Sequence, residues 1–132
     1  MKITFRLLSL LCLAFFSATY AVAADEDTTD YGTPAGTIIV PDGLSASEVQ
    51  RCLLEAAAGR GWTIRAKDDE KVVVFLEDNR WVANLTLRYD TEQVEIFSKS
   101  LRSGKPKLPE NWIKFLKKDA SIKLNTLAIS KG

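Results

Sequence analysis

Histidine is absent from the 132 residues of the chain. Without it, the commonest general base, the Ser-His and Cys-His nucleophile pairs and the usual zinc sites are excluded. The sequence also contains no glycine-rich phosphate loop of the Walker or dinucleotide type. We therefore expect no catalytic, metal-binding or cofactor-binding residue and no cofactor, and the sequence favours a protein that is not an enzyme.

Cysteine is nearly absent as well. The chain has two cysteines, Cys12 and Cys52, and only Cys52 remains if a signal peptide is removed. A lone cysteine cannot form an internal disulfide in an oxidising compartment. Because Cys52 lies beside Val49, Leu53 and Ala56, we interpret it as a small core residue, with pairing between chains as the alternative.

Long hydrophobic runs are missing, except for one near the N-terminus. A short basic start precedes the apolar stretch Leu7 to Phe16, and Ala21-Val22-Ala23 supplies small residues at the positions that a signal peptidase reads. The stretch is too short for a spanning helix, which needs about 20 apolar residues. We predict a signal peptide over residues 1–23, cleaved after Ala23, export to the periplasm or the cell exterior, and no transmembrane segment after cleavage.

The rest of the chain has the size of one domain. Residues 24–36 are acidic and hold almost no aliphatic side chain, so we expect a flexible leader there. Residues 37–129 form the predicted single domain, and residues 130–132 form a C-terminal tail.

Charge is distributed unevenly along the chain. Residues 24–95 hold seven Lys/Arg against fifteen Asp/Glu, a net charge of −8, and residues 96–132 hold nine against two, a net charge of +7. This asymmetry marks either a polar binding surface or charges that complement one another within a folded domain, and the second interpretation is favoured.

The first part of the domain predicts a strand and a helix. Residues 37–40 read as a short edge strand. Ser45 with Glu48 three residues later is a capping box, which predicts a helix start, and Gly59 and Gly61 predict its end. The apolar positions between them recur at helical spacing: Val49, Leu53, Ala56 and Ala57.

From Trp62 the apolar period changes from helical spacing to two. Four alternating stretches separated by short polar turns predict an antiparallel meander with one apolar face. The residues expected on that face are Trp62, Ile64, Ala66, Val72, Val74, Leu76, Trp81, Ala83, Leu85, Leu87, Tyr89, Val94 and Ile96.

A second amphipathic helix is predicted from Asn111 onward. Its apolar stripe consists of Ile113, Leu116, Ala120, Leu124 and Leu127, and Trp112, Phe115 and Ile122 widen it. We expect both helices to pack on the apolar face of the meander. The prediction is a two-layer α+β fold in the order β-α-β-β-β-β-α. That order is typical of a TATA-binding-protein-like architecture, with a helix-grip arrangement as the alternative.

Two surfaces are candidates for binding. The loop from Ser98 to Pro109 is basic and lies near Trp112, so it suits phosphate, anionic lipid or an acidic partner, although a solvated loop is the simpler interpretation. Export argues against nucleic acid. The four cations of this loop are Lys99, Arg102, Lys105 and Lys107.

The second candidate is the outer sheet face, opposite the helices. Apolar residues gathered there form either a dimer interface or ligand surface, or ordinary cross-strand packing. They are Val73, Phe75, Val82 and Phe97.

Two further motifs are better explained without a function. Asp68-Asp69-Glu70 and Glu77-Asp78 suggest calcium, but adjacent carboxylates in a tight hairpin are usually solvated turn residues. Asn84-Leu85-Thr86 fits the N-glycosylation pattern, yet strand alternation explains every residue of that stretch.

The order of several short motifs resembles a group of small, uncharacterised bacterial envelope proteins. The matching segments are Arg60-Gly61-Trp62, Leu85-x-Leu87-x-Tyr89-Asp90, Ile96 through Ser98 with Ser100-Leu101, and Trp112-Ile113-x-x-Leu116. Many members of that group are lipoproteins, but this chain lacks a lipid-anchoring cysteine at the predicted cleavage site. The resemblance implies an envelope location and supplies no catalytic residue.

These observations favour a non-enzymatic binding module for a protein, peptide or envelope component. A structural homo-oligomer that pairs through the outer sheet face is the first alternative. A carboxylate-dependent hydrolase of cell-wall material is the second.

Overall fold

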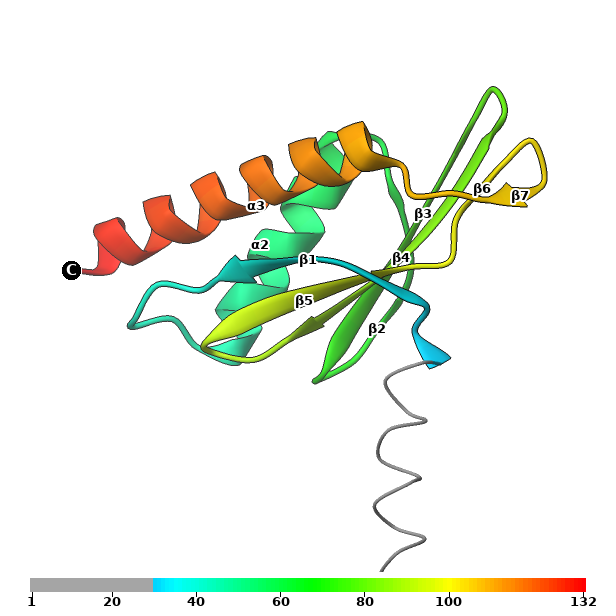
Figure 1. Ribbon diagram of the computed structural model, residues 1–132. Helices are drawn as coiled ribbons and strands as arrows, with labels where there is room; N and C mark the ends of the chain where they lie inside the picture. Colours follow the sequence, from blue (N-terminus) through cyan, green and yellow to red (C-terminus); the bar gives the residue numbers. More distant parts are fainter. Residues whose placement is uncertain (1–29) are drawn as a thin grey trace, which may run out of the picture. The chain divides into compact units, whose positions relative to one another are not determined.

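A mostly antiparallel β-sheet carries two helices on one of its faces in the computed structural model, which describes residues 30–132 (Figure 1). The predicted signal peptide and residues 24–29 of the predicted leader lie outside the described residues. In chain order the elements are β1 (Thr33–Ile39), α2 (Ala46–Gly59), β2 (Thr63–Lys67), β3 (Lys71–Asp78), β4 (Trp81–Tyr89), β5 (Gln93–Ser98), β6 (Leu101–Arg102), β7 (Lys105–Pro106) and α3 (Glu110–Lys131). The predicted α+β class and the β-α-β-β-β-β-α order are confirmed, with β6 and β7 as short additions.

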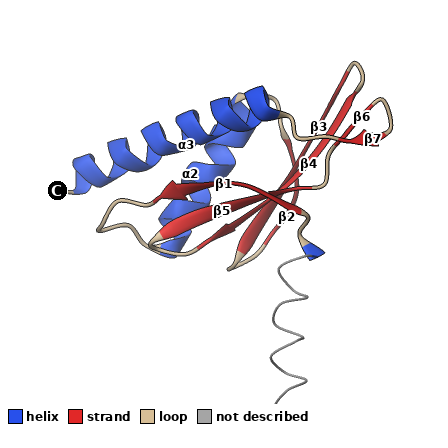
Figure 2. Cartoon of the chain, viewed as in Figure 1, coloured by secondary structure: helices blue, strands red, loops and turns tan. Residues whose placement is uncertain are grey.

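The sheet has the strand order β1-β5-β4-β3-β2. Strands β2 to β5 form the predicted meander, and each pairs antiparallel with its neighbour. Strand β1 pairs antiparallel with β5, so it lies at one edge of the sheet and β2 at the other. Helix α2 therefore spans the sheet between its two edge strands, and Figure 2 shows both helices on the same side of the strands.

The core lies between the sheet and the helices. Leu85 and Leu87 of β4 are 0% and 1% exposed, and Ile113 and Leu116 of α3 are 5% and 1% exposed. Alternation along each strand directs every second side chain to the helices, and the helical stripe of α3 meets them. Cys52 belongs to this core, as predicted, and burial raises the pKa of its thiol. Neither α2 nor α3 combines the length and the apolar character that a membrane-spanning helix requires.

The predicted capping box starts α2. The Glu48 amide donates to Ser45 Oγ at 3.2 Å, and the Ser45 amide donates to Glu48 Oε1 at 2.9 Å. These two bonds satisfy backbone donors that a helix start leaves without partners. Lys131, in the last turn of α3, adds an ion pair to Glu48 Oε1 at 2.6 Å and donates to the Gly43 carbonyl at 2.8 Å.

Both ends of the domain extend further than the sequence predicted. Strand β1 begins at Thr33, so the segment 33–36 belongs to the sheet and not to a leader. The pairing Thr33 with Ser98 is long-range, and a bulge at Pro34–Gly36 accommodates the proline. Helix α3 continues to Lys131, so the predicted tail at 130–132 is mostly helical.

The prediction for Ala66 was wrong. A bulge between Ile64 and Ala66 shifts the register of β2 against β3, so Ala66 pairs with Val73 and is exposed. Ile64 remains packed against the core. A bulge inserts one residue and reverses the face on which the following side chains lie, and simple alternation does not reveal it.

The basic segment 98–109 is more ordered than the predicted loop. Strands β6 and β7 form a small hairpin in which Leu101 pairs with Pro106 and Arg102 with Lys105. Strand β6 also pairs with the start of β4, where Trp81 lies opposite Arg102. We call this segment, Leu101–Pro106, the basic hairpin.

The Glu48 contacts predict an acid-sensitive part of the stability. The hydrogen bond and charge of Lys131, together with the bonds to Ser45, lower the pKa of Glu48 from 4.5 to about 2. Because the folded-state pKa is depressed, this contribution is complete above the ordinary value and is lost as pH falls from about 4.5 through about 2. Side-chain NMR titration of Glu48 should give the low pKa directly.

Glu48→Gln should flatten the dependence of unfolding free energy on pH across that window, as measured by urea denaturation at several pH values. Glu77→Gln, at an exposed position of β3, controls for the loss of one negative charge. An unchanged pH dependence in Glu48→Gln would show that the contacts do not persist in solution.

Candidate functional site

The three tryptophans of the chain meet at one end of the sheet. Trp62 precedes β2, Trp81 is the first residue of β4, and Trp112 lies in the first turn of α3. The ring centroids of Trp62 and Trp112 are 6.1 Å apart in an edge-to-face arrangement, and those of Trp81 and Trp112 are 5.9 Å apart with planes inclined by 49°. Trp112 therefore stands between a buried tryptophan and a partly exposed one.

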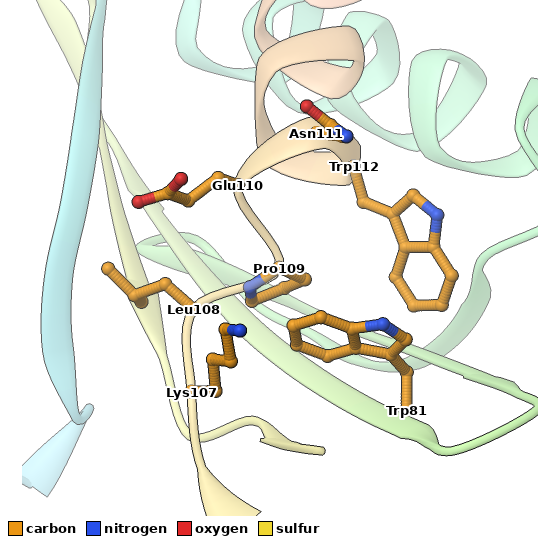
Figure 3. A pocket seen from close by; sticks show the side chains of 7 residues that line it. All are labelled: Trp81, Lys107, Leu108, Pro109, Glu110, Asn111 and Trp112. Carbon is orange, nitrogen blue, oxygen red and sulfur yellow. The ribbon is translucent and has the colours of Figure 1, made fainter.

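Trp81 and Trp112 line a groove with a volume of about 230 Å³ (Figure 3). We call it the tryptophan groove, and its lining residues are Trp81, Lys107, Leu108, Pro109, Glu110, Asn111 and Trp112. Figure 3 shows the Pro109 ring over Trp81 and the Trp112 ring beside it. Pro109 is buried, whereas both tryptophans are partly exposed, so aromatic surface is available to a ligand.

The groove also carries polar side chains without partners. Within residues 30–132, no hydrogen bond or ion pair engages the side chains of Lys107, Glu110 or Asn111. In Figure 3 the Glu110 carboxylate points away from the two indole rings, and Lys107 lies on the Trp81 side. Next to the aromatic rings the available charge is therefore positive.

The basic hairpin places a second cation at the groove. The guanidinium carbon of Arg102 lies 5.7 Å from the centroid of Trp81, within the range of a cation–π contact. Arg102, Lys105 and Lys107 are all exposed. Of the four predicted basic residues, the structure thus brings Arg102 and Lys107 to the tryptophans and Lys105 beside them. Lys99 is also exposed, and its backbone amide donates to the Asn84 carbonyl at 2.9 Å.

A neighbouring depression on the other side of Trp112 differs in its electrostatics. Arg60, Trp62, Leu76, Trp112 and Phe115 line it. The Arg60 side chain already donates to Asp119, and its guanidinium carbon lies 4.9 Å from the Phe115 centroid. The Asp119 carboxylate raises the pKa of Arg60, and Arg60 lowers that of Asp119. This cation is engaged within the fold, unlike Lys107.

The four outer-face residues do not form one open apolar patch. Phe97, which pairs with Pro34 and Thr86, is only 3% exposed. The Phe75 ring lies under the guanidinium of Arg65, 3.7 Å from its carbon to the centroid. Val73 and Val82 are partly exposed at separate positions on β3 and β4.

The acidic turns have a structural explanation. Asp68 Oδ1 accepts from the amides of Glu70 and Lys71 at 2.8 and 2.9 Å, which closes the turn before β3. These backbone bonds lower the pKa of Asp68, and Asp90 has the same pattern in the turn before β5. Within residues 30–132, no group of three or more acidic or cysteine side chains is arranged to hold a metal ion.

The predicted strand at Asn84 is present. Asn84 lies inside β4, opposite Phe75 of β3, and its amide donates to Ser100 Oγ at 3.1 Å. Its side chain is partly buried. The backbone of the sequon is therefore committed to the sheet.

Sequence reasoning missed the groove itself. It placed Trp81 on the inner face and noted that Trp112 is close to the basic segment, but it did not bring the two rings together. The usable signal was that each tryptophan stands at or beside the start of an element. The strand order decides which of these elements begin at the same end of the fold.

Comparison with known proteins adds no assignment. No protein-family model matches the chain, and no curated protein is detectably similar to it. The function has to be inferred from the site.

Proposed function

We propose that this protein is a non-enzymatic binding module of the bacterial envelope that takes its ligand in the tryptophan groove. The supporting observation is the pair Trp81 and Trp112, partly exposed and 5.9 Å apart, beside unpartnered polar groups. Small binding sites combine aromatic walls with a few polar groups that fix orientation. Tryptophan and arginine are also the residues that most often dominate binding energy.

The composition of the groove favours binding over hydrolysis. A hydrolase of the two-carboxylate type needs a pair of carboxyl groups facing the scissile bond. Glu110 is the only acidic residue among the described residues that line the groove, and its carboxylate points away from the rings (Figure 3). The groove therefore has the parts for holding a ligand and lacks the second carboxylate of that mechanism.

The proposal predicts that one aromatic side chain controls binding. The purified protein would be titrated with three classes of envelope component, namely anionic lipid vesicles, cell-wall glycan fragments and unstructured peptides, and followed by tryptophan fluorescence and calorimetry. At least one class should bind. Trp81→Ala should weaken that binding by about tenfold or more, because loss of a tryptophan that dominates a binding site costs about 1.4 kcal/mol or more.

Phe75→Ala is the matched control, since it removes an aromatic ring from the outer face of the same sheet. Its affinity should equal that of the wild type. If no class binds, or if Trp81→Ala binds as tightly as the wild type, the groove is not the binding site.

A further inference from the structure

We propose that the ligand of the tryptophan groove is an acidic glycan, a chain of pyranose rings that carries carboxylate groups. One sugar ring stacks against the exposed side of Trp81 and Trp112, and Lys107 and Arg102 hold a carboxylate of the chain. This inference rests on the proposed binding function and names its ligand class.

The aromatic geometry suits a single ring of a longer chain. The volume of about 230 Å³ lies below the roughly 300–1,000 Å³ of pockets that enclose a whole small molecule. The groove borders the basic hairpin, because Trp81 pairs with Arg102 there. An indole face is the negative side of its quadrupole, so it attracts the polarised C–H groups on the flat side of a pyranose.

The polar groups fit sugar substituents. The Asn111 amide offers two donors and an acceptor, and the Lys107 ammonium offers three donors. Both side chains are exposed and without partners in the described part of the chain. Neighbouring sugar hydroxyls both donate and accept, so an amide can bind two of them at once.

Strand β4 gives an extended peptide no free edge at this site. Peptides that bind to a sheet usually add a strand at a free edge. At the groove, Trp81 pairs with Asp78 of β3 on one side and with Arg102 of β6 on the other. Strand β4 is thus paired on both sides at this position. The unpaired edge beside it belongs to β7, which is two residues long and includes Pro106, a residue without an amide hydrogen.

Charge selects an acidic chain. Lys105 and Arg102 lie opposite each other in the basic hairpin, and Lys107 follows it. The turn between β3 and β4 adds Arg80, whose carbonyl accepts from the Ser103 amide at 2.8 Å and so fixes that turn to the hairpin. Arg102 and Lys107 are thus the cations at the rings, and Lys105 and Arg80 belong to the adjoining hairpin and turn. The carboxylates at this end are Asp78, opposite Trp81, and Glu110, which points away from the rings (Figure 3). The charge beside the rings is therefore positive, and its field attracts anions over roughly one Debye length, about 8–10 Å.

The test compares an acidic glycan with its neutral form. Tetragalacturonate and its fully methyl-esterified form would be titrated against the purified protein, with fluorescence and calorimetry as readouts. Tetragalacturonate should bind at one to one and about tenfold more tightly than the ester, because the ester loses its ion pairs. Raising the sodium chloride concentration from 50 to 500 mM should weaken the binding of tetragalacturonate and leave the binding of the ester nearly unchanged.

Two variants separate the parts of the site. Lys107→Ala should reduce the affinity for tetragalacturonate several-fold and that for the ester much less, because only the acid loses an ion pair, whereas Trp81→Ala should reduce both affinities alike. The charge-matched control is Lys67→Ala, because Lys67 is an exposed cation at the end of the edge strand β2 that is farther from Trp62. Circular dichroism melting would confirm that each variant is folded.

Three results would overturn the inference. Equal affinity for tetragalacturonate and its ester would show that the carboxylates of the glycan do not contribute to binding. A proline-rich or acidic peptide that binds more tightly than either glycan, with loss in Trp81→Ala, rejects the glycan but retains the proposed binding function. No binding of any glycan, vesicle or peptide rejects both.

Discussion

Leu85→Ala should lower the free energy of unfolding by about 2–5 kcal/mol, the usual cost of emptying a buried leucine site. Leu85 is fully buried in β4, which lies in the middle of the sheet. Its neighbours in register are Val74 of β3 and Ser98 of β5, both also buried. Because strands flank it on both sides and helices cover it, the cavity cannot collapse easily.

Urea denaturation followed by circular dichroism would measure this loss. Leu101→Ala is the matched control, because Leu101 lies in the short strand β6 and is 37% exposed. We expect that change to cost less than about 1 kcal/mol, in the range of surface substitutions. Equal losses in the two variants would mean that β4 does not direct Leu85 into the core, and the two-layer arrangement would be wrong.

Trp62→Ala should cost about 3–5 kcal/mol, the range for a large aromatic removed from a core. Trp62 is 5% exposed and packs edge-to-face on Trp112. Its backbone amide donates to the Ala57 carbonyl at 3.0 Å, so the residue also fixes the turn between α2 and β2. Removing its side chain takes support from Trp112, and through it from the tryptophan groove.

The melting temperature and the unfolding free energy would be compared with those of Trp81→Ala. The Trp81 side chain is partly exposed, so it loses less buried surface when truncated than Trp62 does. The Trp81 substitution should therefore destabilise the fold less than the Trp62 substitution. A larger loss in Trp81→Ala than in Trp62→Ala would reverse the assigned roles. The groove would then be a structural feature and Trp62 a peripheral one.

The sequence predicted the elements that depend on local pattern. The capping box at Ser45, the alternation through Leu85 and the stripe through Leu116 each repeat over a few residues, and burial follows directly from such a period. The face of the sheet that receives the helices could be derived in the same way. The predicted envelope location and the resemblance to bacterial envelope proteins remain predictions.

The errors share one physical cause, which is pairing between distant residues. Thr33 joins the sheet because β5 offers it an edge, and the bulge between Ile64 and Ala66 shifts the register of β2 against β3. Similarly, Arg102 and Lys105 are ordered by the start of β4. Local composition describes these segments correctly as polar, but it carries no information about the partner strand.

The candidate site was the least predictable part for the same reason. Trp81 and Trp112 are neighbours because β4 begins where α3 begins to cross the sheet. No spacing in the chain encodes that coincidence. Tryptophans at or beside the start of an element are a weak signal, which a predicted strand order would strengthen.

The contact of Lys131 with Glu48 and with the Gly43 carbonyl joins two helix ends that are far apart in sequence. The final turn of α3 is consequently held to the opening turn of α2 by the contacts of Lys131. Fraying of the α3 end removes the Lys131 contacts from Glu48 and Gly43, while the capping box of α2 keeps its own two hydrogen bonds. A fusion or label attached immediately after Gly132 would disturb the Lys131 contacts. One in the exposed turn at Asn79–Arg80 would leave them intact but would lie beside the basic hairpin.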